Sequence, residues 1–344
     1  MREQTIGVGT LQLDGGSLLP NVEQRVTIYG TPSASGDNFV LVCHALTGSS
    51  RAAEWWPGIV GPGGLFDPQE WCVICINVLG SCYGSTGPTN WSGDPGSVAG
   101  FPKLSVGDMV RAQRRVLDEL GIEGLEFVIG GSLGGMQALQ WALDAPERVG
   151  HAIVVGAHDH FSPMGIALNH VQREALELDP VRGLGLARKI AMLSYKSEEL
   201  FNERHGRLPD RKDPSRFDIE GYLDLQAERF LGRMDAASYA ALTHAMDGFD
   251  VRDRKRDPRV DLTFVGISSD WLFRPEDVGA AAERLHAAYL EIDSAHGHDA
   301  FLAEDIVLAG SLQSIALQHS PVRGRAGLQA GGSNRSRVST GQNP

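Results

Sequence analysis

The sequence predicts an α/β protein built around a mostly parallel, doubly wound sheet, and three observations support this prediction. Short apolar runs of strand length recur along the chain, these runs have no regularly spaced polar face, and amphipathic stretches with helical spacing separate them. Buried parallel strands joined by helices produce this alternation. The expected strands are residues 39–43, 72–78, 127–129, 152–155, 262–267 and 288–292, and the expected helices include residues 106–120 and 136–143.

Length and charge limit the possible functions. A chain of 344 residues with 42% hydrophobic content suits one large domain carrying an insertion. The formal net charge of −12 disfavours nucleic acid as a partner, because that binding relies on a basic face. Residues 1–20 lack the basic and apolar regions of a leader, and no apolar run approaches the ~20 residues that span a bilayer. We therefore expect a cytoplasmic protein with no nucleic-acid partner and no membrane partner.

The four cysteines are too few to form a disulfide framework in a chain of this length. Cys72 and Cys75 have the spacing of a redox or zinc pair, but they lie within an expected strand. Side chains three apart on a strand point to opposite faces, so we expect these thiols to be buried and unpaired.

The strand pattern stops at about residue 161 and returns at residue 262. The intervening residues are charged and helical in pattern, as at 188–200 and 222–234. We expect residues 1–160 and 258–319 to form the core, and residues 161–257 to form a helical lid insertion over the strand ends. Residues 320–344 are rich in Gly, Ser and Arg, lack acidic residues and have no periodicity, so we expect them to be disordered.

A nucleophile turn is the most informative motif. The apolar run ending at residue 129 leads into Gly130-Gly131-Ser132-Leu133-Gly134, and helical spacing follows. A strand, a tight turn and a helix in this order form a nucleophile elbow, which predicts the α/β-hydrolase fold with Ser132 as nucleophile. Glycine is needed because the serine is strained and because side chains two residues either side would collide with neighbouring elements. The alternative is a glycine-rich connection of no catalytic use.

Two backbone amides are candidates for an oxyanion hole. The helix after Ser132 points its first amides towards the reaction centre, and the Leu133 N–H is one expected donor. The second is expected from the loop His44-Ala45-Leu46-Thr47-Gly48, at Leu46, because this loop follows the strand at 39–43. We expect His44 to be structural and not a catalytic base.

The acid and base of a catalytic triad are expected on loops after the late strands, in the order nucleophile, acid, histidine. Asp270 follows the strand at 262–267 and is the candidate acid. His296 and His298 both lie on the loop after the strand at 288–292, and the pattern alone does not separate them.

Two other polar groups have simpler explanations. His158, Asp159 and His160 follow the strand at 152–155, but ligands at i and i+2 need further partners that the nearby sequence does not offer. We therefore expect no metal. Residues 252–256 are mixed in sign, which favours a solvated connector, with contact to a nucleotide phosphate as the alternative.

Six further blocks of the sequence are His44-Ala45-Leu46-Thr47-Gly48, Asn77-Val78-Leu79-Gly80-Ser81-Cys82-Tyr83, Gly84-Ser85-Thr86-Gly87-Pro88, residues 130–141, Ser269-Asp270-Trp271-Leu272-Phe273 and Gly297-His298-Asp299-Ala300-Phe301-Leu302. Through these blocks, residues 41–302 resemble the homoserine O-acetyltransferase family. The resemblance implies that His298 is the base, that Asp299 lies near the amino group of a bound amino acid, and that Arg188 and Tyr195 hold its carboxylate and surroundings. It also implies a homodimer. The alternative for Arg188 is a solvated lid charge.

The resemblance implies ping-pong transfer of an acetyl group from acetyl-CoA to the hydroxyl of L-homoserine. Acetyl-CoA is then a cosubstrate, no cofactor is bound, and O-acetyl-L-homoserine feeds methionine biosynthesis. A succinyl-CoA donor, an L-serine acceptor and an esterase are alternatives, and a non-catalytic binding protein is a weaker one. The chain departs from the family in a shorter segment between Arg173 and Ala187, and at residues 158–161, where small residues and serine are commoner. These departures concern substrate choice more than reaction type.

Overall fold

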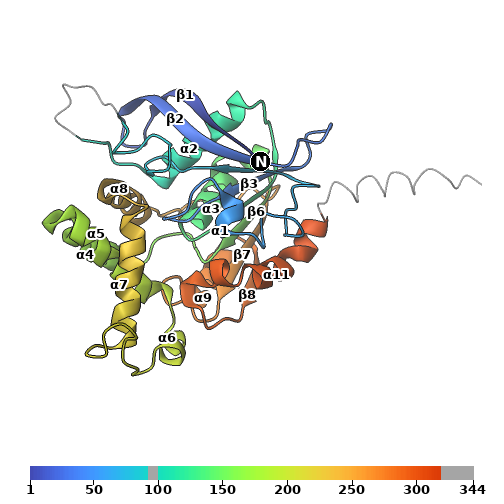
Figure 1. Ribbon diagram of the computed structural model, residues 1–344. Coiled ribbons are helices and arrows are strands. Elements are labelled where there is room, and N and C mark those ends of the chain that lie inside the picture. Colours follow the sequence, from blue (N-terminus) through green and yellow to red (C-terminus); the bar gives the residue numbers. More distant parts are fainter. Residues whose placement is uncertain (92–99, 319–344) are drawn as a thin grey trace, which may run out of the picture.

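The described part of the computed structural model, residues 1–91 and 100–318, contains an eight-stranded sheet with helices on both faces (Figure 1). The strand order is β1-β2-β4-β3-β5-β6-β7-β8. Neighbouring strands from β4 to β8 are parallel, whereas β2 pairs antiparallel with both β1 and β4. The expected mostly parallel, doubly wound sheet is confirmed.

The bounds of the elements follow the chain in order. The strands are β1 Arg2–Gln12, β2 Leu18–Tyr29, β3 Phe39–Cys43, β4 Cys72–Ile76, β5 Leu125–Gly131, β6 Val149–Val155, β7 Asp261–Ile267 and β8 Ala288–Ile292. The helices are α1 Ala52–Trp55, α2 Val106–Glu119, α3 Leu133–Asp144, η1 Pro146–Arg148, α4 Pro163–Leu178, α5 Pro180–Tyr195, α6 Glu198–Arg204, α7 Asp218–Leu231, α8 Ala236–Asp247, α9 Pro275–Arg284, η2 Gly297–Asp299, α10 Ala300–Ala303 and α11 Asp305–Gln318.

The six strands expected from the sequence all form, and their ends differ by a few residues. The N-terminal hairpin of β1 and β2 was not predicted. Its first strand alternates exposed and partly buried residues and is largely solvated, so it lacks the continuous apolar run by which the other strands were found. Pairing of β2 with β4, with Val26 opposite Ile76, covers an edge that β4 would otherwise expose.

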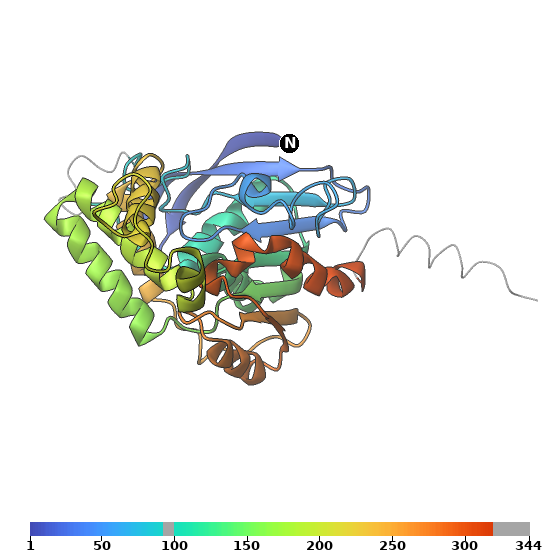
Figure 2. The same ribbon diagram turned by 60° about the horizontal axis from the view of Figure 1, so that its bottom comes forward.

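Apolar side chains fill the space on both faces of the sheet. Cys72 and Cys75, both on β4, belong to different core clusters and are both free thiols. Their burial on opposite faces confirms that this pair belongs to a strand and is not a redox or zinc motif. Figure 2 shows α4–α8 grouped at one end of the molecule.

Helices α4–α8 connect β6 to β7 and form the expected helical insertion. Between Val155 and Asp261, the described chain has only two isolated β-bridges and no strand. The helical pattern expected at 188–200 is not one helix, because α5 ends at Tyr195 and Ser197 begins α6 by accepting a hydrogen bond from the Leu200 N–H.

Two expectations concern the chain termini and membranes. The segment 320–344, expected to be disordered, lies outside the described residues. No single described helix is long and apolar enough to cross a membrane. Among the described helices, Gly297–Ala303 and Asp305–Gln318 have the length and composition of a span only when taken together, and they are bent by 74° where they meet.

Candidate active site

Ser132 lies in the tight turn between β5 and α3. Its backbone has φ 57° and ψ −125°, a conformation that costs free energy for a residue with a side chain. An added Cβ would lie 2.1 Å from the Cys43 carbonyl oxygen at Gly134, and 2.2 Å from the Gly134 oxygen at Gly130. Neither position has room for a side chain. The turn therefore holds Ser132, which is 6% exposed, at the end of a buried strand.

Asp270 and His298 form a buried pair. The Nδ1 of His298 lies 2.7 Å from Oδ2 of Asp270, and both residues are 2% exposed. The other carboxylate oxygen of Asp270 accepts hydrogen bonds from the backbone N–H groups of Leu272 and Phe273, each at 2.9 Å. These bonds fix the carboxylate, which in turn orients the imidazole.

The surroundings of His298 favour its use as a base. Burial alone would lower the pKa of His298, but the charge of Asp270 and the hydrogen bond to it outweigh burial and raise this pKa above its ordinary value of 6.5. Phe273 stacks on the imidazole, with ring centroids 5.1 Å apart. The Nε2 atom is buried and has no hydrogen-bond partner among the described residues, so it is free to take a proton.

The ring of His298 lies beside the serine turn. An added Cβ on Gly131 would be 2.5 Å from the Phe301 ring, whose centroid is 5.6 Å from that of His298. On the other side, an added Cβ on Gly156 would be 3.5 Å from Cε1 of His298. By contrast, Nε2 of His296 faces Arg204 at 3.5 Å. The structure thus places His298, and not His296, against Asp270.

One glutamine links the two backbone segments that carry the candidate oxyanion donors. Nε2 of Gln137, on α3, donates to the backbone oxygens of Leu133 at 3.1 Å and of His44 at 3.2 Å. It therefore links the helix that follows Ser132 to the loop that carries Leu46. Sequence reasoning missed Gln137, although its position four residues after Leu133 places it on the same face of a helix.

His44 has the structural role expected for it. Its Nε2 accepts a hydrogen bond from the Val78 N–H at 2.9 Å, and its Nδ1 lies 2.8 Å from the Ala45 oxygen. Burial lowers the pKa of His44 to about 4, so its ring is neutral at physiological pH. The loop is fixed by these bonds.

Arg188 lies among aromatic rings of the helical insertion. Its guanidinium carbon is 5.2 Å from the Phe230 ring centroid and 5.8 Å from that of Tyr195. Its Nε is buried without a hydrogen-bond partner, and no carboxylate of the described residues forms an ion pair with it. Burial raises the pKa of Tyr195 to about 12, so its hydroxyl remains protonated, and its ring lies 5.7 Å from that of His298. An unpaired cation beside Tyr195, whose ring contacts that of His298, can receive an anionic group.

The loop of His298 is joined to the helical insertion. Nζ of Lys196 lies 2.9 Å from Oδ2 of Asp299, and Ser197 Oγ donates to the Ala295 oxygen. Gly297 has φ 65°, and an added Cβ there would be 2.8 Å from the Tyr195 oxygen. Sequence reasoning missed Lys196, because nothing near it in the chain marks its partner.

Two other sequence features have structural explanations. Ser85 Oγ donates to the Asn77 oxygen at 2.5 Å and accepts from the Arg25 N–H at 2.9 Å, so the block around it joins its loop to β2. In the basic connector, Arg252 pairs with Asp250 and Arg254 pairs with Asp144. These pairs favour the solvated connector over a phosphate site.

The sequence is similar to one family model and to individual relatives. A family model described as "alpha/beta hydrolase fold" matches residues 38–305. A homoserine O-acetyltransferase of Moorella thermoacetica is 38% identical, over 90% of this chain and 94% of the relative. One from Thermus thermophilus is 43% identical, over 84% of each chain.

Solved structures show the same fold. The homoserine O-acetyltransferase of Staphylococcus aureus aligns with a TM-score of 0.77 and 28% identity, over 91% of this chain and 94% of the other. Esterase E22 aligns with a TM-score of 0.81 and 22% identity, over 92% of this chain and 99% of the other. The second likeness shows the fold alone, and the fold is therefore shared by transferases and esterases.

Proposed function

The chain belongs to the homoserine O-acetyltransferase family, whose fold is that of the α/β hydrolases, and from this premise we propose that it transfers the acetyl group of acetyl-CoA to the hydroxyl of L-homoserine. The observation that carries the proposal is the buried pair of His298 and Asp270 beside the strained turn of Ser132. The product is O-acetyl-L-homoserine, for methionine biosynthesis.

In the first half-reaction, Ser132 attacks the thioester carbonyl of acetyl-CoA while Nε2 of His298 takes its proton. Asp270 stabilises the imidazolium that forms. The N–H groups of Leu133 and Leu46 bind the oxyanion, at roughly 3 kcal/mol of transition-state stabilisation per donor. CoA then leaves as the thiol, with the proton returned by His298.

In the second half-reaction, the hydroxyl of L-homoserine attacks the acetyl-Ser132 ester, and His298 again acts as base. The bond between the acetyl group and Ser132 then breaks, and Ser132 recovers its proton from His298. Arg188 receives the substrate carboxylate, with Tyr195 beside it, and Asp299 receives the substrate ammonium group. Because Lys196 already pairs with Asp299, the ammonium group shares this carboxylate with Lys196 or displaces it. No resident cofactor takes part in these steps.

The lid is proposed to be residues 161–257, inserted into a core of residues 1–160 and 258–319. It excludes water from the acetyl-enzyme, because the end of α5 is anchored to the loop of His298 through Ser197. Water exclusion favours transfer over hydrolysis by an esterase, the main alternative that shares this fold.

Release of thiol from acetyl-CoA tests the proposed function. Turnover is expected with L-homoserine, and much less with L-serine, with no acceptor or with succinyl-CoA as donor. Equal thiol release with and without an acceptor would show a hydrolase. Faster turnover with L-serine or succinyl-CoA would assign a different acyltransferase of the same family.

Substitution of Arg188 by methionine is expected to raise KM for L-homoserine about 10- to 100-fold, because one charged hydrogen-bonded contact contributes ~1.5–3 kcal/mol. Acetylation of Ser132 by acetyl-CoA alone, measured by mass spectrometry, is expected to be unchanged. Arg182→Met removes an exposed arginine from the same helix and is the matched control. Equal effects on both half-reactions would argue against a carboxylate contact.

The activity is expected to rise with pH through the raised pKa of His298, because only the neutral imidazole accepts a proton. A plot of log(kcat/KM) against pH should have unit slope at acid pH and level off above pH 6.5. The pair of His298 and Asp270 also stabilises the fold at acid pH, because folding raises the pKa of His298. Its contribution to the free energy of unfolding is fully present below the pKa of His298 in the unfolded chain. It is lost as pH rises through the pKa of His298 in the folded protein. A profile with its midpoint at or below 6.5 would contradict the role of Asp270.

The assembly is proposed to be a homodimer formed through α4 and α5, in the cytoplasm. Exposed apolar side chains lie on these helices, at Leu178 (89% exposed), Val181 (64%) and Leu186 (49%). The four free thiols are typical of a reducing compartment. Light scattering after size exclusion tests the assembly, and Leu178→Asp with Val181→Asp is expected to give monomers.

A further inference from the structure

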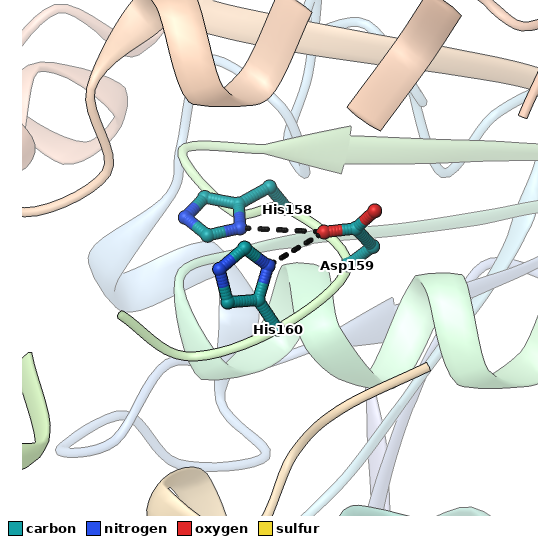
Figure 3. A group of neighbouring side chains, drawn as sticks. All are labelled: His158, Asp159 and His160. Carbon is teal, nitrogen blue, oxygen red and sulfur yellow. Dashed lines mark hydrogen bonds and ion pairs between the residues drawn. The ribbon is translucent and has the colours of Figure 1, made fainter. Parts of the chain in front are cut away.

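We propose that His158, Asp159 and His160 form a binding site for a zinc-like divalent metal ion at the carboxyl end of β6. One ligand atom from each side chain lies within 4.8 Å of the others. Both histidines face the same oxygen of Asp159 (Figure 3), with Nδ1 of His160 at 2.8 Å and Nδ1 of His158 at 3.7 Å from Oδ1. The two ring nitrogens are thus directed at one carboxylate oxygen.

His158 is the residue that points to a ligand. It is 1% exposed, and neither of its ring nitrogens has a hydrogen-bond partner among the described residues. A buried polar side chain without a partner costs free energy, and such groups are rare in folded proteins unless they bind a water or an ion. A metal ion at Nδ1 of His158 would satisfy one of these nitrogens.

The backbone holds this segment in place before any ion binds. The Val251 N–H donates to the Asp159 oxygen at 2.8 Å, and the Phe161 N–H donates to the Phe249 oxygen at 2.9 Å. His160 also forms a β-bridge with Asp250. The three ligands are therefore fixed between β6 and the segment that returns from α8.

A second group of contacts orients the carboxylate. Oδ2 of Asp159 accepts a hydrogen bond from Nε of Arg284 at 2.6 Å, and Arg284 is itself held by the Arg252 oxygen at 2.8 Å. Oδ1 of Asp159 is thus left to face the histidines, and such outer contacts are typical of metal ligands.

The ligand set selects the class of metal. Two imidazole nitrogens and one carboxylate oxygen are ligands of zinc, whereas calcium and magnesium prefer oxygen. Zinc bonds of about 2.1 Å in tetrahedral geometry separate ligand atoms by about 3.4 Å, so the ring of His160 moves away from Oδ1 as the ion replaces its proton. The His160 side chain is 27% exposed, which leaves a path for the ion and for water as fourth ligand.

This site is separate from the candidate active site. The two sites share no residue, and Phe273 contacts both: its ring centroid lies 5.4 Å from that of His158 and 5.1 Å from that of His298. The expectation of no metal assumed that ligands at i and i+2 need further partners that the nearby sequence does not offer. Here the residue between them supplies the third ligand, since the turn brings all three side chains to one side.

Isothermal titration of the EDTA-treated full chain with ZnCl₂ tests the site. We expect one Zn²⁺ per chain at this site, with affinity at least tenfold lower in His158→Asn and in His160→Asn, since the loss of even an outer contact costs about 10- to 100-fold. His170→Asn is the matched control, because His170 is exposed and pairs only with Glu174 at 3.6 Å. CoCl₂ is expected to give the visible absorption of tetrahedral Co²⁺ in the wild type and not in the two variants.

Melting curves of the metal-free proteins show whether the variants fold. If His158→Asn unfolds, His160→Asn still tests the site, because its position is partly exposed. Absence of Zn²⁺ binding by the wild type would overturn the proposal. Binding that is unchanged in both His158→Asn and His160→Asn would also overturn it, by assigning the ion to other residues. Neither outcome depends on the acetyltransferase activity.

Discussion

Replacement of Ser132 by alanine is expected to lower kcat for acetyl transfer by on the order of 10⁶-fold, the loss found when a triad serine is removed. The reason is geometric. The turn presents the Ser132 hydroxyl at the end of β5, and side chains at Gly130 or Gly134 would clash with the backbone, so these positions of the turn cannot supply a replacement. Thiol release from acetyl-CoA in the presence of L-homoserine measures the loss.

Folding of the Ser132→Ala variant is expected to be unaffected, because alanine and serine meet the same strain at φ 57°. Ser311→Ala, which alters an exposed serine on α11, is the matched control and should retain full activity. Substantial turnover by a folded Ser132→Ala variant would mean that the acetyl group is never carried by this residue.

The turn of Ser132 could be predicted from the sequence because its determinants are local. Gly130 and Gly134 are fixed by contacts with their own turn and with the end of β3, and these contacts leave a recognisable spacing in the chain. The parallel strands were found for a similar reason, because burial on both faces requires continuous apolar runs.

The partners of Ser132 were harder to predict because they depend on contacts between distant segments. Which of His296 and His298 faces Asp270 is determined by the bend at Gly297, whose amide is held by Ser269 at 2.9 Å. Gln137 and Lys196 act on backbone or side chains brought near by folding, so no local pattern marks them. The same holds for the contact between Asp159 and Arg284, which are 125 residues apart.

Substitution of His298, on the loop that also carries His296, is expected to give the second large loss of activity. His298→Asn is expected to lower kcat on the order of 10⁶-fold, because the residue that replaces the base cannot accept the proton of Ser132. His296→Asn is expected to retain most of the activity, since His296 contacts Arg204 and not Asp270. Both are measured by the same thiol-release assay at a pH where neutral imidazole predominates.

These two variants form a matched pair, since they make the same substitution two residues apart on one loop. Circular dichroism and melting temperature identify any general damage to the loop. Such damage is more of a risk in His298→Asn, because this substitution leaves Asp270 buried without its partner. If the loop is intact, a large loss in His296→Asn with a small one in His298→Asn would reverse the assignment of the base. Equal and small losses would instead imply that Ser132 is activated by a group outside this loop, and the role assigned to Asp270 would fail with that of His298.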